Sequence, residues 1–318
     1  MNRFSIIIAT RNRPADLREC LSSLSSQEQK ADQIIIIDQS DEKYRVEVRE
    51  LCKNISAEYY FLDYPKSLTH SRNLGIERAS GDFVLFLDDD VVLEADYLKN
   101  MGLFFSSHPD AVGATGMITN LYAVPLWYSA VKAAYKFVRW IFLLDTLDFS
   151  GYEITPVFEN SSSVFPPKKE KKVRLLSGSN MCIRAAVAKK EKFEHRFVKY
   201  SYKEDVDISF RASLNGELWF LAGCRLIHKV SEAGRLPDKE RERMLEVNSY
   251  YLFCKNMKPG FFGRLLYAYS RIGKLLVRYI PLAIIRPAIP VEYLTTIYYV
   301  FRNRKEIEKG ETADFFKR

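Results

Sequence analysis

The segment from Gly81 to Asp90 constrains the fold more than any other, because an apolar run ends there in three adjacent carboxylates. Phe83 to Leu87 is short, continuously apolar and bounded by glycine and by charge, which is typical of a strand buried on both faces of a parallel sheet. Ligands of open α/β sheets bind at the carboxyl ends of such strands, so we expect the acids at a site. Three carboxylates there repel one another unless a hard divalent cation joins them, and such a cation typically also grips a substrate phosphate.

The triplet Asp88, Asp89 and Asp90 has a second interpretation, as an acidic turn that caps a helix over 93–101. Asp is a common turn and N-cap residue, so an isolated acidic triplet does not exclude this interpretation. The rest of the chain favours the site.

Expected strands and helices alternate up to this triplet. The strands end in polar residues, the helices carry apolar residues at helical spacing, and Pro14 is placed to open the first helix. This order is typical of a doubly wound, nucleotide-binding half-domain. Neither G-x-G-x-x-G after the first strand nor G-x-x-x-x-G-K-[ST] occurs, so the sequence lacks the motifs of dinucleotide-binding proteins and of P-loop nucleotide-binding proteins. The expected strands are 4–9, 34–37, 59–62 and 83–87, and the expected helices are 15–25, 46–53 and 69–79.

Five short motifs in this order resemble those of the family-2 inverting glycosyltransferases of the GT-A fold. Each is weak alone, but five at plausible spacing are specific, and they cover roughly the first third of the chain. The resemblance implies an α/β fold with a mostly parallel sheet flanked by helices, a nucleotide-sugar donor, and Mn²⁺ or Mg²⁺ as cofactor. The motifs are I-I-I-A-T-R-N-R at 6–13, I-I-D-Q-S at 36–40, S-R-N-L-G at 71–75, S-G-D-F-V-L-F-L at 80–87 and D-D-D at 88–90.

The same resemblance implies roles for single residues. Asp88 would face the ribose, and Asp90 would bind the metal ion that bridges the diphosphate. Such a metal stabilises the negative charge that develops when the sugar–phosphate bond breaks. Arg72 would lie near the nucleotide, with an arginine on a helix surface as the alternative. The residues implied to contact the donor in this first part of the chain are Thr10, Arg11, Asn12, Asp38, Arg72, Asp88 and Asp89.

Two later motifs extend the resemblance. The segment 175–184 is similar to the family's glycine-containing strand beside the acceptor, which places Asn180 near the donor diphosphate or the acceptor. The segment 202–211 is similar to a Glu-Asp motif at the head of a helix. An inverting transferase needs one carboxylate to take the proton of the acceptor hydroxyl, so Asp205 is the predicted base and Glu204 the fallback. The alternative is that both acids only favour the helix N-terminus through its dipole.

The segment after 217 predicts two edge strands, 218–221 and 224–227, followed by His228. In this fold a histidine downstream of the Glu-Asp motif often completes the shell of the metal, which makes His228 a predicted metal ligand. A purely structural histidine is the alternative. Asp207 and Arg211 stand four residues apart and are predicted to pair on one helix.

The net charge of +8 is concentrated near the C-terminus. Between Lys255 and Arg304, nine basic residues stand against Glu292 alone, which accounts for the whole excess. A localised basic block predicts an anionic partner such as lipid headgroups, nucleic acid or an acidic substrate. The expected helix from Phe261 has two faces, one apolar with Leu265, Tyr269, Ile272, Leu276 and Tyr279, and one basic with Arg264, Arg271, Lys274 and Arg278.

This pattern is typical of a basic amphipathic helix that lies in a lipid interface, and the apolar stripe suits lipid better than nucleic acid. Packing against a second subunit remains a further possibility. The segment 127–144 also has an apolar and a basic face, and a helix packed on the core is its alternative interpretation. The segment 152–174 is polar and proline-containing, which favours mobility, and is either a lid over the donor or a solvated linker.

No stretch reaches spanning length without a break or a charge. The five cysteines are odd in number, scattered and without C-x-x-C spacing, which argues against a disulfide framework and a zinc site. The chain begins almost directly with a strand, which leaves no room for a signal peptide. We therefore expect a cytoplasmic protein on the inner face of the cell membrane.

Together these observations predict a metal-dependent inverting glycosyltransferase that acts on a hydroxyl of a glycan acceptor, expected to be lipid-linked. The expected domains are a catalytic domain at 1–235, with halves 1–110 and 111–235, and a membrane-associating region at 236–318. A nucleotidyltransferase and an inactive sugar-nucleotide binding module are the alternatives. The prediction depends on the acids at 88–90 and Asp205 facing one cavity.

Overall fold

The computed structural model describes residues 2–64, 66–121, 125–231 and 237–312. The chain forms two compact units, each made of segments that are far apart in the sequence. Unit 1 comprises Met1–Ala123, Pro167–Tyr200 and Ile208–Arg235, and unit 2 comprises Val124–Pro166, Ser201–Asp207 and Leu236–Arg318. The expected boundary at 235/236 lies outside the described residues, and the predicted domain division stays a prediction. Segments 124–166 and 201–207 group with the C-terminal residues rather than with the sheet.

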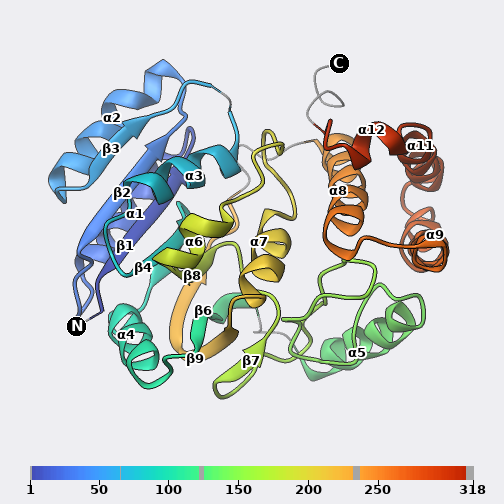
Figure 1. Ribbon diagram of the computed structural model, residues 1–318, viewed down its shortest axis with the longest axis horizontal. Helices are drawn as coiled ribbons and strands as arrows, with labels where there is room; N and C mark the ends of the chain where they lie inside the picture. The colour runs from blue at the N-terminus through green and yellow to red at the C-terminus, as the bar shows by residue number, and fades with distance from the viewer. Residues whose placement is uncertain (1, 65, 122–124, 232–236, 313–318) are drawn as a thin grey trace. The chain divides into compact units, whose positions relative to one another are not determined.

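Unit 1 is built on a sheet whose N-terminal half is wholly parallel, as the alternation of strands and helices predicted (Figure 1). Its strands follow the order β3-β2-β1-β4, so the first strand lies in the middle of this half. The elements are β1 (Phe4–Thr10), α1 (Pro14–Ser25), β2 (Gln33–Asp38), α2 (Glu42–Asn54), β3 (Glu58–Phe61), α3 (Leu68–Arg78) and β4 (Phe83–Asp88).

The second half of the sheet is mixed. Strand β8 is antiparallel to both β4 and β6, whereas β9 is parallel to β6 and antiparallel to β5 and β7. The expectation of two edge strands was wrong. One strand spans both segments and lies inside the sheet, with a register shift between Gly116 and Met117 of its neighbour. The remaining elements of this unit are β5 (Val91–Leu93), α4 (Tyr97–Ser107), β6 (Ala111–Ile118), η1 (Thr119–Leu121), β7 (Lys171–Val173), β8 (Asn180–Arg184), α6 (Ala185–Glu191) and β9 (Glu217–His228).

Strand β1 is buried on both faces, which is why its sequence is continuously apolar. Ile6 and Ile8 point into a core formed with α1, α2 and α4, and Ile7 faces α3 on the opposite side. At one end of the core the rings of Phe83 and Phe105 stack at 4.2 Å between centroids. The two helix layers thus fix the position of the strand ends at which the polar residues stand.

Unit 2 is mainly helical. Helix α7 (Glu204–Ser213) contributes its first four residues to this unit and the rest to unit 1. The other helices are α5 (Leu126–Ile141), α8 (Asp238–Leu252), η2 (Phe253–Met257), α9 (Phe261–Lys274), η3 (Leu275–Tyr279), α10 (Ile280–Leu282), α11 (Ile289–Arg302) and α12 (Arg304–Glu308), of which η2 and η3 are π-helical.

Helix α5 turns a basic side chain inward and apolar side chains outward. Lys136 is 1% exposed and pairs with the buried Asp145, and its Nζ also donates to Ser161 Oγ at 2.7 Å. Val131 and Tyr135 are 56% and 40% exposed. The alternative of a helix that packs its apolar face on the core is therefore wrong for these residues.

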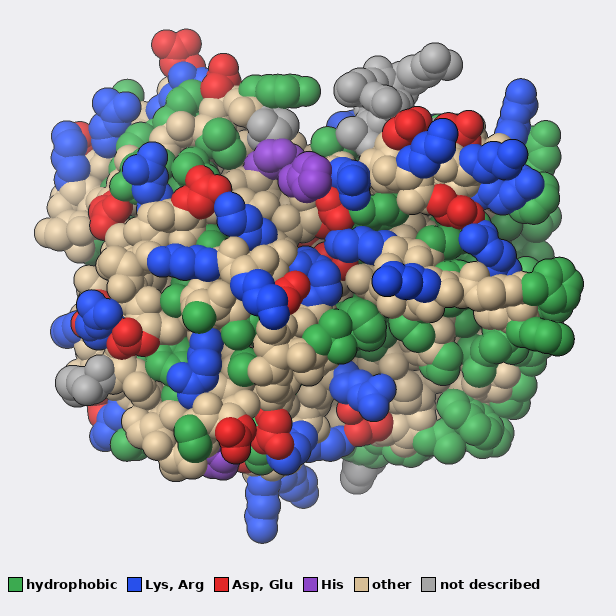
Figure 2. All heavy atoms as spheres, in the orientation of Figure 1, with side chains coloured by type: hydrophobic (Ala, Val, Ile, Leu, Met, Phe, Trp, Pro, Cys, Tyr) green, Lys and Arg blue, Asp and Glu red, His purple; other side chains and the backbone are tan. Residues whose placement is uncertain are grey.

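Helix α9 has the same inverted arrangement. Arg271 and Lys274 are buried, 4% and 7% exposed, and both pair with Glu246 of α8, whereas Leu265 and Ile272 are 50% and 57% exposed. The expected helix is confirmed, but these two basic residues do not face outward as predicted. Hydrophobic side chains gather over α9 and α5 at the right of the view in Figure 2.

The segment before β7 is held by buried side chains in its unit 2 part. Phe158 and Glu159 are 0% and 6% exposed, and Asp145 accepts hydrogen bonds from Ser161 and Ser162. The composition of this segment predicted mobility, whereas this part of it packs. Among the described residues, no helix is long and apolar enough to cross a membrane.

Replacing Gly116 by alanine should lower the midpoint of chemical denaturation. The added Cβ would clash with the carbonyl oxygen of Cys224 and would lie 2.7 Å from the ring of Tyr97. Neither the backbone nor the buried ring has room to move away. We expect a loss of about 1–3 kcal/mol in the free energy of unfolding, as for overpacked cores. Gly223→Ala in β9 is the matched control, since its Cβ would come no closer than 3.8 Å to Asn100. Equal stability of the two variants would contradict the prediction.

Candidate metal and donor site

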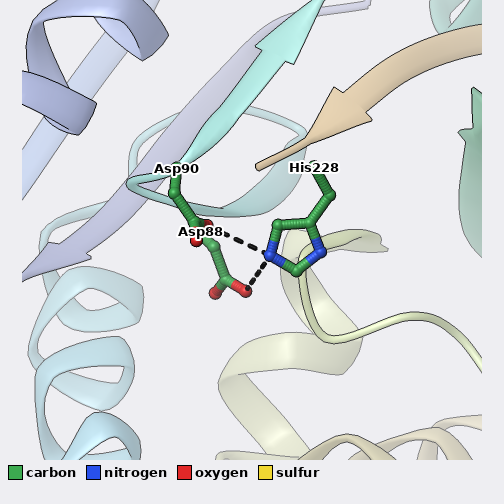
Figure 3. A group of neighbouring side chains, drawn as sticks. All are labelled: Asp88, Asp90 and His228. Carbon is green, nitrogen blue, oxygen red and sulfur yellow. Dashed lines mark ion pairs between the residues drawn. The ribbon is translucent and has the colours of Figure 1, made fainter. Parts of the chain in front are cut away.

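Two acids and a histidine meet at the carboxyl ends of β4 and β9 (Figure 3). Asp88 is the last residue of β4, and Asp90 stands two residues later. His228 ends β9 opposite Val91 in the antiparallel β5–β9 pair. Asn120 fixes the backbone of the histidine on both sides, because its Nδ2 donates to His228 O at 2.8 Å and its Oδ1 accepts from His228 N at 3.1 Å.

The three side chains point toward one another. His228 Nε2 lies 3.1 Å from Asp90 Oδ1 and 3.9 Å from Asp88 Oδ2. One ligand atom from each residue lies within 4.8 Å of the other two, which is a suitable spacing for one shared metal ion. Asp90 and His228 were predicted as metal ligands, and the structure places Asp88 beside them, whereas the prediction assigned Asp88 to the ribose.

Asp90 has the bonding pattern of a metal ligand. Its Oδ2 accepts from the backbone N–H of Ser231 at 2.9 Å, and its buried Oδ1 lies 3.1 Å from His228 Nε2, with no other partner in the described part of the chain. Burial alone would raise the pKa of Asp90, but the hydrogen bond and charge of His228 outweigh it and leave the pKa lowered. The carboxylate is therefore ionised, with one oxygen available to a cation.

The donor set fits a divalent cation of the hard type. Carboxylate oxygens suit Mg²⁺ and Mn²⁺, and the imidazole nitrogen is accepted better by Mn²⁺ than by Mg²⁺, which prefers oxygen. Burial raises the pKa of Asp88, and the charges of Arg72 and His228 oppose this shift. A cation between Asp88 and Asp90 would remove the repulsion between the two carboxylates.

Asp89 points away from this cluster. Its Oδ2 accepts from Thr10 Oγ1 at 2.7 Å and its Oδ1 from Arg13 Nη1 at 3.2 Å. Burial, opposed by Arg13 and Thr10, raises the pKa of Asp89 to about 7. The hydroxyl of Thr10 and the carboxylate of Asp89 thus bind each other across the ends of β1 and β4, and their contact with a nucleotide stays a prediction.

Arg72 is buried rather than on a helix surface, so the alternative for this residue was wrong. It is 2% exposed, and its Nη2 donates to Asp88 Oδ1 at 3.1 Å and to Gly178 O at 2.7 Å. The ring of Phe193 lies 5.3 Å from the guanidinium carbon. Arg72 therefore holds one oxygen of Asp88 in place while the other faces His228.

The turns after β1 and β2 join into one polar rim. Asn12, which has a positive φ of 60°, donates from its Nδ2 to Asp41 and accepts from the N–H of Asp41, both at 2.8 Å. Asp38 is fully buried at the end of β2 and accepts from Tyr59 Oη at 2.9 Å. Burial, with the hydrogen bond to Asp38, raises the pKa of Tyr59 to about 12. Arg11 is exposed on this rim.

Asn180 faces the neighbouring strand. It lies opposite Leu87 in the β4–β8 register, and its side-chain oxygen accepts from Thr115 Oγ1 and from Gly116 N at 3.1 Å. The side chain therefore ties β8 to β6, and its contact with donor or acceptor stays a prediction.

Glu204 and Asp205 begin α7, as the motif predicted. Glu204 is 8% exposed and Asp205 is half-buried, with its Oδ1 accepting from the N–H of Val206 at 2.9 Å. Both acids belong to unit 2. Their role as base, and the common cavity with the acids at 88–90, stay predictions. Asp207 pairs with Lys255 at 3.1 Å, and Arg211 with Glu191 at 3.3 Å.

Sequence reasoning missed two residues that position the site, Arg13 and Asn120. Arg13 lies within the first motif, and its Nη1 is also 3.8 Å from Asp90 Oδ2, so it contacts two of the three acids. A second arginine in a turn after a central strand was an available signal for an anion partner. Asn120 had no comparable signal, because its contacts with His228 follow only from the β6–β9 pairing.

The sequence profile of the family described as "Glycosyl transferase family 2" matches residues 5–165, just over half of the chain. The chain belongs to glycosyltransferase family 2. This confirms the resemblance carried by the five motifs. The matched range contains both acids of the cluster but not His228 or the Glu-Asp motif.

Two curated glycosyltransferases are similar over part of the chain. The GalNAc(5)-diNAcBac-PP-undecaprenol beta-1,3-glucosyltransferase of Campylobacter jejuni is 36% identical over 104 residues, which are 32% of this chain and 34% of that protein. The putative glycosyltransferase EpsH of Bacillus subtilis is 30% identical over 105 residues, 30% of this chain and 28% of that protein. The aligned part thus spans about a third of these relatives.

Solved glycosyltransferases share the fold over most of the chain. The mannosyltransferase PcManGT of Pyrobaculum calidifontis, in complex with GDP-Man and Mn²⁺, aligns with a TM-score of 0.57 at 13% identity over 98% of this chain and 84% of that chain. TarS of S. aureus, residues 1–349, aligns with a TM-score of 0.55 at 16% identity over 88% and 74%. This family-2 glycosyltransferase therefore has the predicted GT-A fold.

Asp90→Asn should abolish tight Mn²⁺ binding, because it removes the charge of the buried ligand whose Oδ1 faces His228. His228→Ala should weaken binding at least about tenfold through loss of one donor. Isothermal titration calorimetry of the apo-protein with Mn²⁺ measures both without relying on activity. Asp82→Asn is the control, since Asp82 is exposed and pairs with Arg3. Wild-type affinity in the Asp90 variant would exclude this cluster as the metal site.

Proposed function

We propose that this family-2 enzyme is an inverting, metal-dependent glycosyltransferase that moves a sugar from a nucleotide-diphosphate sugar to a hydroxyl of a glycan. The observation that carries the proposal is the Asp88–Asp90–His228 cluster at the carboxyl ends of the strands. PcManGT and GalNAc-T7, which share the fold, were solved with Mn²⁺ together with GDP-Man in the first case and with UDP and GalNAc in the second. Mn²⁺ is therefore the preferred candidate, with Mg²⁺ as the alternative.

Different residues of the chain are proposed to bind different parts of the donor. A metal ion held by the cluster would stabilise the charge of the departing nucleoside diphosphate. Asp38 and the turn with Arg11 and Asn12 are proposed to contact the base and ribose, because they stand at the ends of β2 and β1, and β1 pairs with β4. Arg72 keeps Asp88 oriented.

For the acceptor, Asp205 is proposed as the base that removes the hydroxyl proton during in-line attack at the anomeric carbon. Its position in the first turn of α7 favours the ionised carboxylate through the helix dipole. Glu204 precedes it in the same turn and is the alternative base or a contact for acceptor hydroxyls. Inversion follows from a single displacement in which no enzyme nucleophile takes part.

The acceptor is proposed to be lipid-linked, in the assembly of a cell-surface polysaccharide or glycoconjugate. The Campylobacter jejuni relative is named for an undecaprenol-diphosphate-linked acceptor. The exposed apolar side chains of α5 and α9 in unit 2, together with Ile284 and Ile285 in the turn after α10, are of the kind that would attach such an enzyme to a membrane. We propose peripheral attachment to the cytoplasmic face of the membrane, with a homo-oligomer contact as the alternative use of these side chains.

Membership of glycosyltransferase family 2 argues against the nucleotidyltransferase alternative. A catalytically inactive binding module is the remaining rival, and it differs from the enzyme only in turnover. The test therefore has to separate donor binding from transfer.

Asp205→Asn should retain donor and Mn²⁺ binding but lose transfer by a factor of about 10²–10⁴, the usual contribution of a general base. A thermal-shift panel of UDP-, GDP-, dTDP- and CMP-linked sugars with and without Mn²⁺ first identifies the donor, because binding stabilises the native state. Transfer of that sugar to a lipid-linked acceptor is then measured for the wild type and the variant.

Asp63→Asn, at an exposed position, is the control for loss of a carboxylate. Full transfer by the Asp205 variant would remove the base assignment. Donor binding without transfer by the wild type, with any acceptor tried, would favour the inactive module.

The membrane proposal predicts that substituting serine for both Ile284 and Ile285 weakens co-sedimentation with anionic vesicles at least about tenfold. These side chains are 89% and 84% exposed, and each would contribute roughly 1.5–3 kcal/mol when buried in lipid. Deletion after Lys258 is a poorer test, because it removes Arg271 and Lys274 and leaves Glu246 buried without its partners.

Val46→Ser is the control for this experiment, since Val46 is 74% exposed on α2 of unit 1. Unchanged sedimentation of the double serine variant would exclude Ile284 and Ile285 from a lipid contact. A concentration-dependent change in oligomeric state of the same variant would indicate the subunit contact instead.

A further inference from the structure

Lys203, the residue directly before α7, breaks two local rules of helix formation. Its carbonyl oxygen accepts from the N–H of Asp207 at 3.1 Å, so the lysine stands at the N-cap position of the helix. Short side chains with an acceptor oxygen are preferred there, and a cation is unfavourable beside the positive end of the helix dipole. Its φ of 72° is also uncommon for a residue other than glycine. Local sequence preference therefore does not explain a lysine at this position.

The side chain of Lys203 is buried against a distant segment of the chain. It is 5% exposed, its Nζ pairs with the carboxylate of Glu159, and the same nitrogen donates to the carbonyl oxygen of Phe158 at 3.3 Å. These partners stand 44 and 45 residues earlier in the sequence and are buried themselves. The two contacts offset the unfavourable local conformation, because strained backbone persists only where the surrounding structure holds it.

Glu159 is held in turn by two cations of α9. Arg271 Nη1 lies 2.7 Å and Lys274 Nζ 3.8 Å from its Oε1, and both cations also pair with Glu246 of α8. Burial alone would raise the pKa of Glu159, but the three neighbouring cations hold this pKa well below its usual range. The partner of Lys203 is therefore an ionised carboxylate that is fixed to two helices of unit 2.

The first turn of α7 is held at two further points, both within unit 2. Asn248 of α8 donates from its Nδ2 to the carbonyl oxygen of Tyr202 at 2.8 Å. Asp207 is fully buried and accepts from Lys255 Nζ at 3.1 Å. The two acids that begin the helix thus lie between backbone positions that are fixed on either side.

We propose that Lys203 is a positioning residue, whose bond to Glu159 fixes the backbone from which Glu204 and Asp205 project. The inference rests on the proposed function, because it takes Asp205 as the base. A general base acts only within hydrogen-bond reach of the proton that it removes, and a misplacement of about 1 Å can cost about a hundredfold in rate. The buried ionic cluster of α8 and α9 is thereby part of the frame that holds the base.

Lys203→Met tests this role, because it retains an unbranched, buried side chain but removes the charge and the donor. Glu159 keeps Arg271 and Lys274 as partners, so we expect a folded protein with a melting temperature close to that of the wild type. Its kcat for transfer should fall about ten- to hundredfold, with the KM for the donor and the affinity for Mn²⁺ unchanged. Lys203→Arg, which restores a cationic donor, should recover most of the rate.

Hydrogen exchange measures the position of this turn without relying on activity. The amides of residues 204–207 should exchange faster in Lys203→Met than in the wild type, because one anchor of the turn is lost. Arg278→Met is the matched control, since it removes another ion pair of unit 2, the one with Glu242 of α8 at 2.8 Å. It should leave both the exchange of residues 204–207 and kcat unchanged.

Unchanged exchange in Lys203→Met, or faster exchange with wild-type kcat, would overturn the inference. An equal fall in kcat in Arg278→Met would overturn it as well, because the loss would then follow from any broken ion pair of this unit. Each of these results leaves Asp205→Asn inactive. Full transfer by Asp205→Asn would instead show that the proposed base itself is wrong.

Discussion

The concentration of carboxylates at the end of β4 is the electrostatic constraint on which unit 1 depends. Each acid has a different compensation: Asp88 contacts Arg72, Asp89 contacts Thr10 and Arg13, and Asp90 faces His228. These compensating groups come from α3, from the last residue of β1 and the turn after it, and from the last residue of β9. The sheet order that brings those elements to β4 is therefore also what makes three adjacent acids tolerable in a largely buried place.

Unequal environments separate the acids chemically. Burial raises the pKa of Asp89 to about 7, whereas His228 keeps the pKa of Asp90 lowered. Asp89 therefore forms its bonds within the protein, with Thr10 and Arg13, whereas Asp88 and Asp90 each direct one oxygen toward His228. Asp88 ends β4 and Asp89 and Asp90 form the turn before β5, so it is this turn that brings the two outer acids of the D-x-D spacing to His228.

Much of this arrangement was predictable from local sequence. The apolar runs of β1, β2 and β4 and the polar residues at their ends predict a parallel half-sheet, and the motif series predicted the GT-A fold and the pairing of Asp90 with His228. The partners of Arg72 and Asn180 were not predictable, because they depend on β8 lying antiparallel beside β4. Edge strands were expected where β9 lies inside the sheet, since short apolar runs do not indicate which neighbours will pair.

In unit 2 the sequence periodicity correctly predicts the helices α5 and α9, but it does not predict which face of each helix is buried. Helical spacing shows that two faces differ, but it does not show which one packs inward, and the usual rule that apolar faces are buried fails here. Lys136, Arg271 and Lys274 are buried because Asp145, Glu159 and Glu246 supply buried counter-charges from distant segments. Only the fold brings those acids together, so composition alone suggested basic residues free to meet lipid.

The path of the chain between the two units has a consequence for how such proteins can diversify. It passes from one unit to the other near residues 123, 166, 200, 207 and 235, and α7 carries residues of both within one helix. Neither unit is a continuous stretch of gene, so recombination at a single point cannot exchange one and keep the other intact. Sheet and helical unit are therefore expected to be inherited together and to change by point substitution rather than by shuffling of modules.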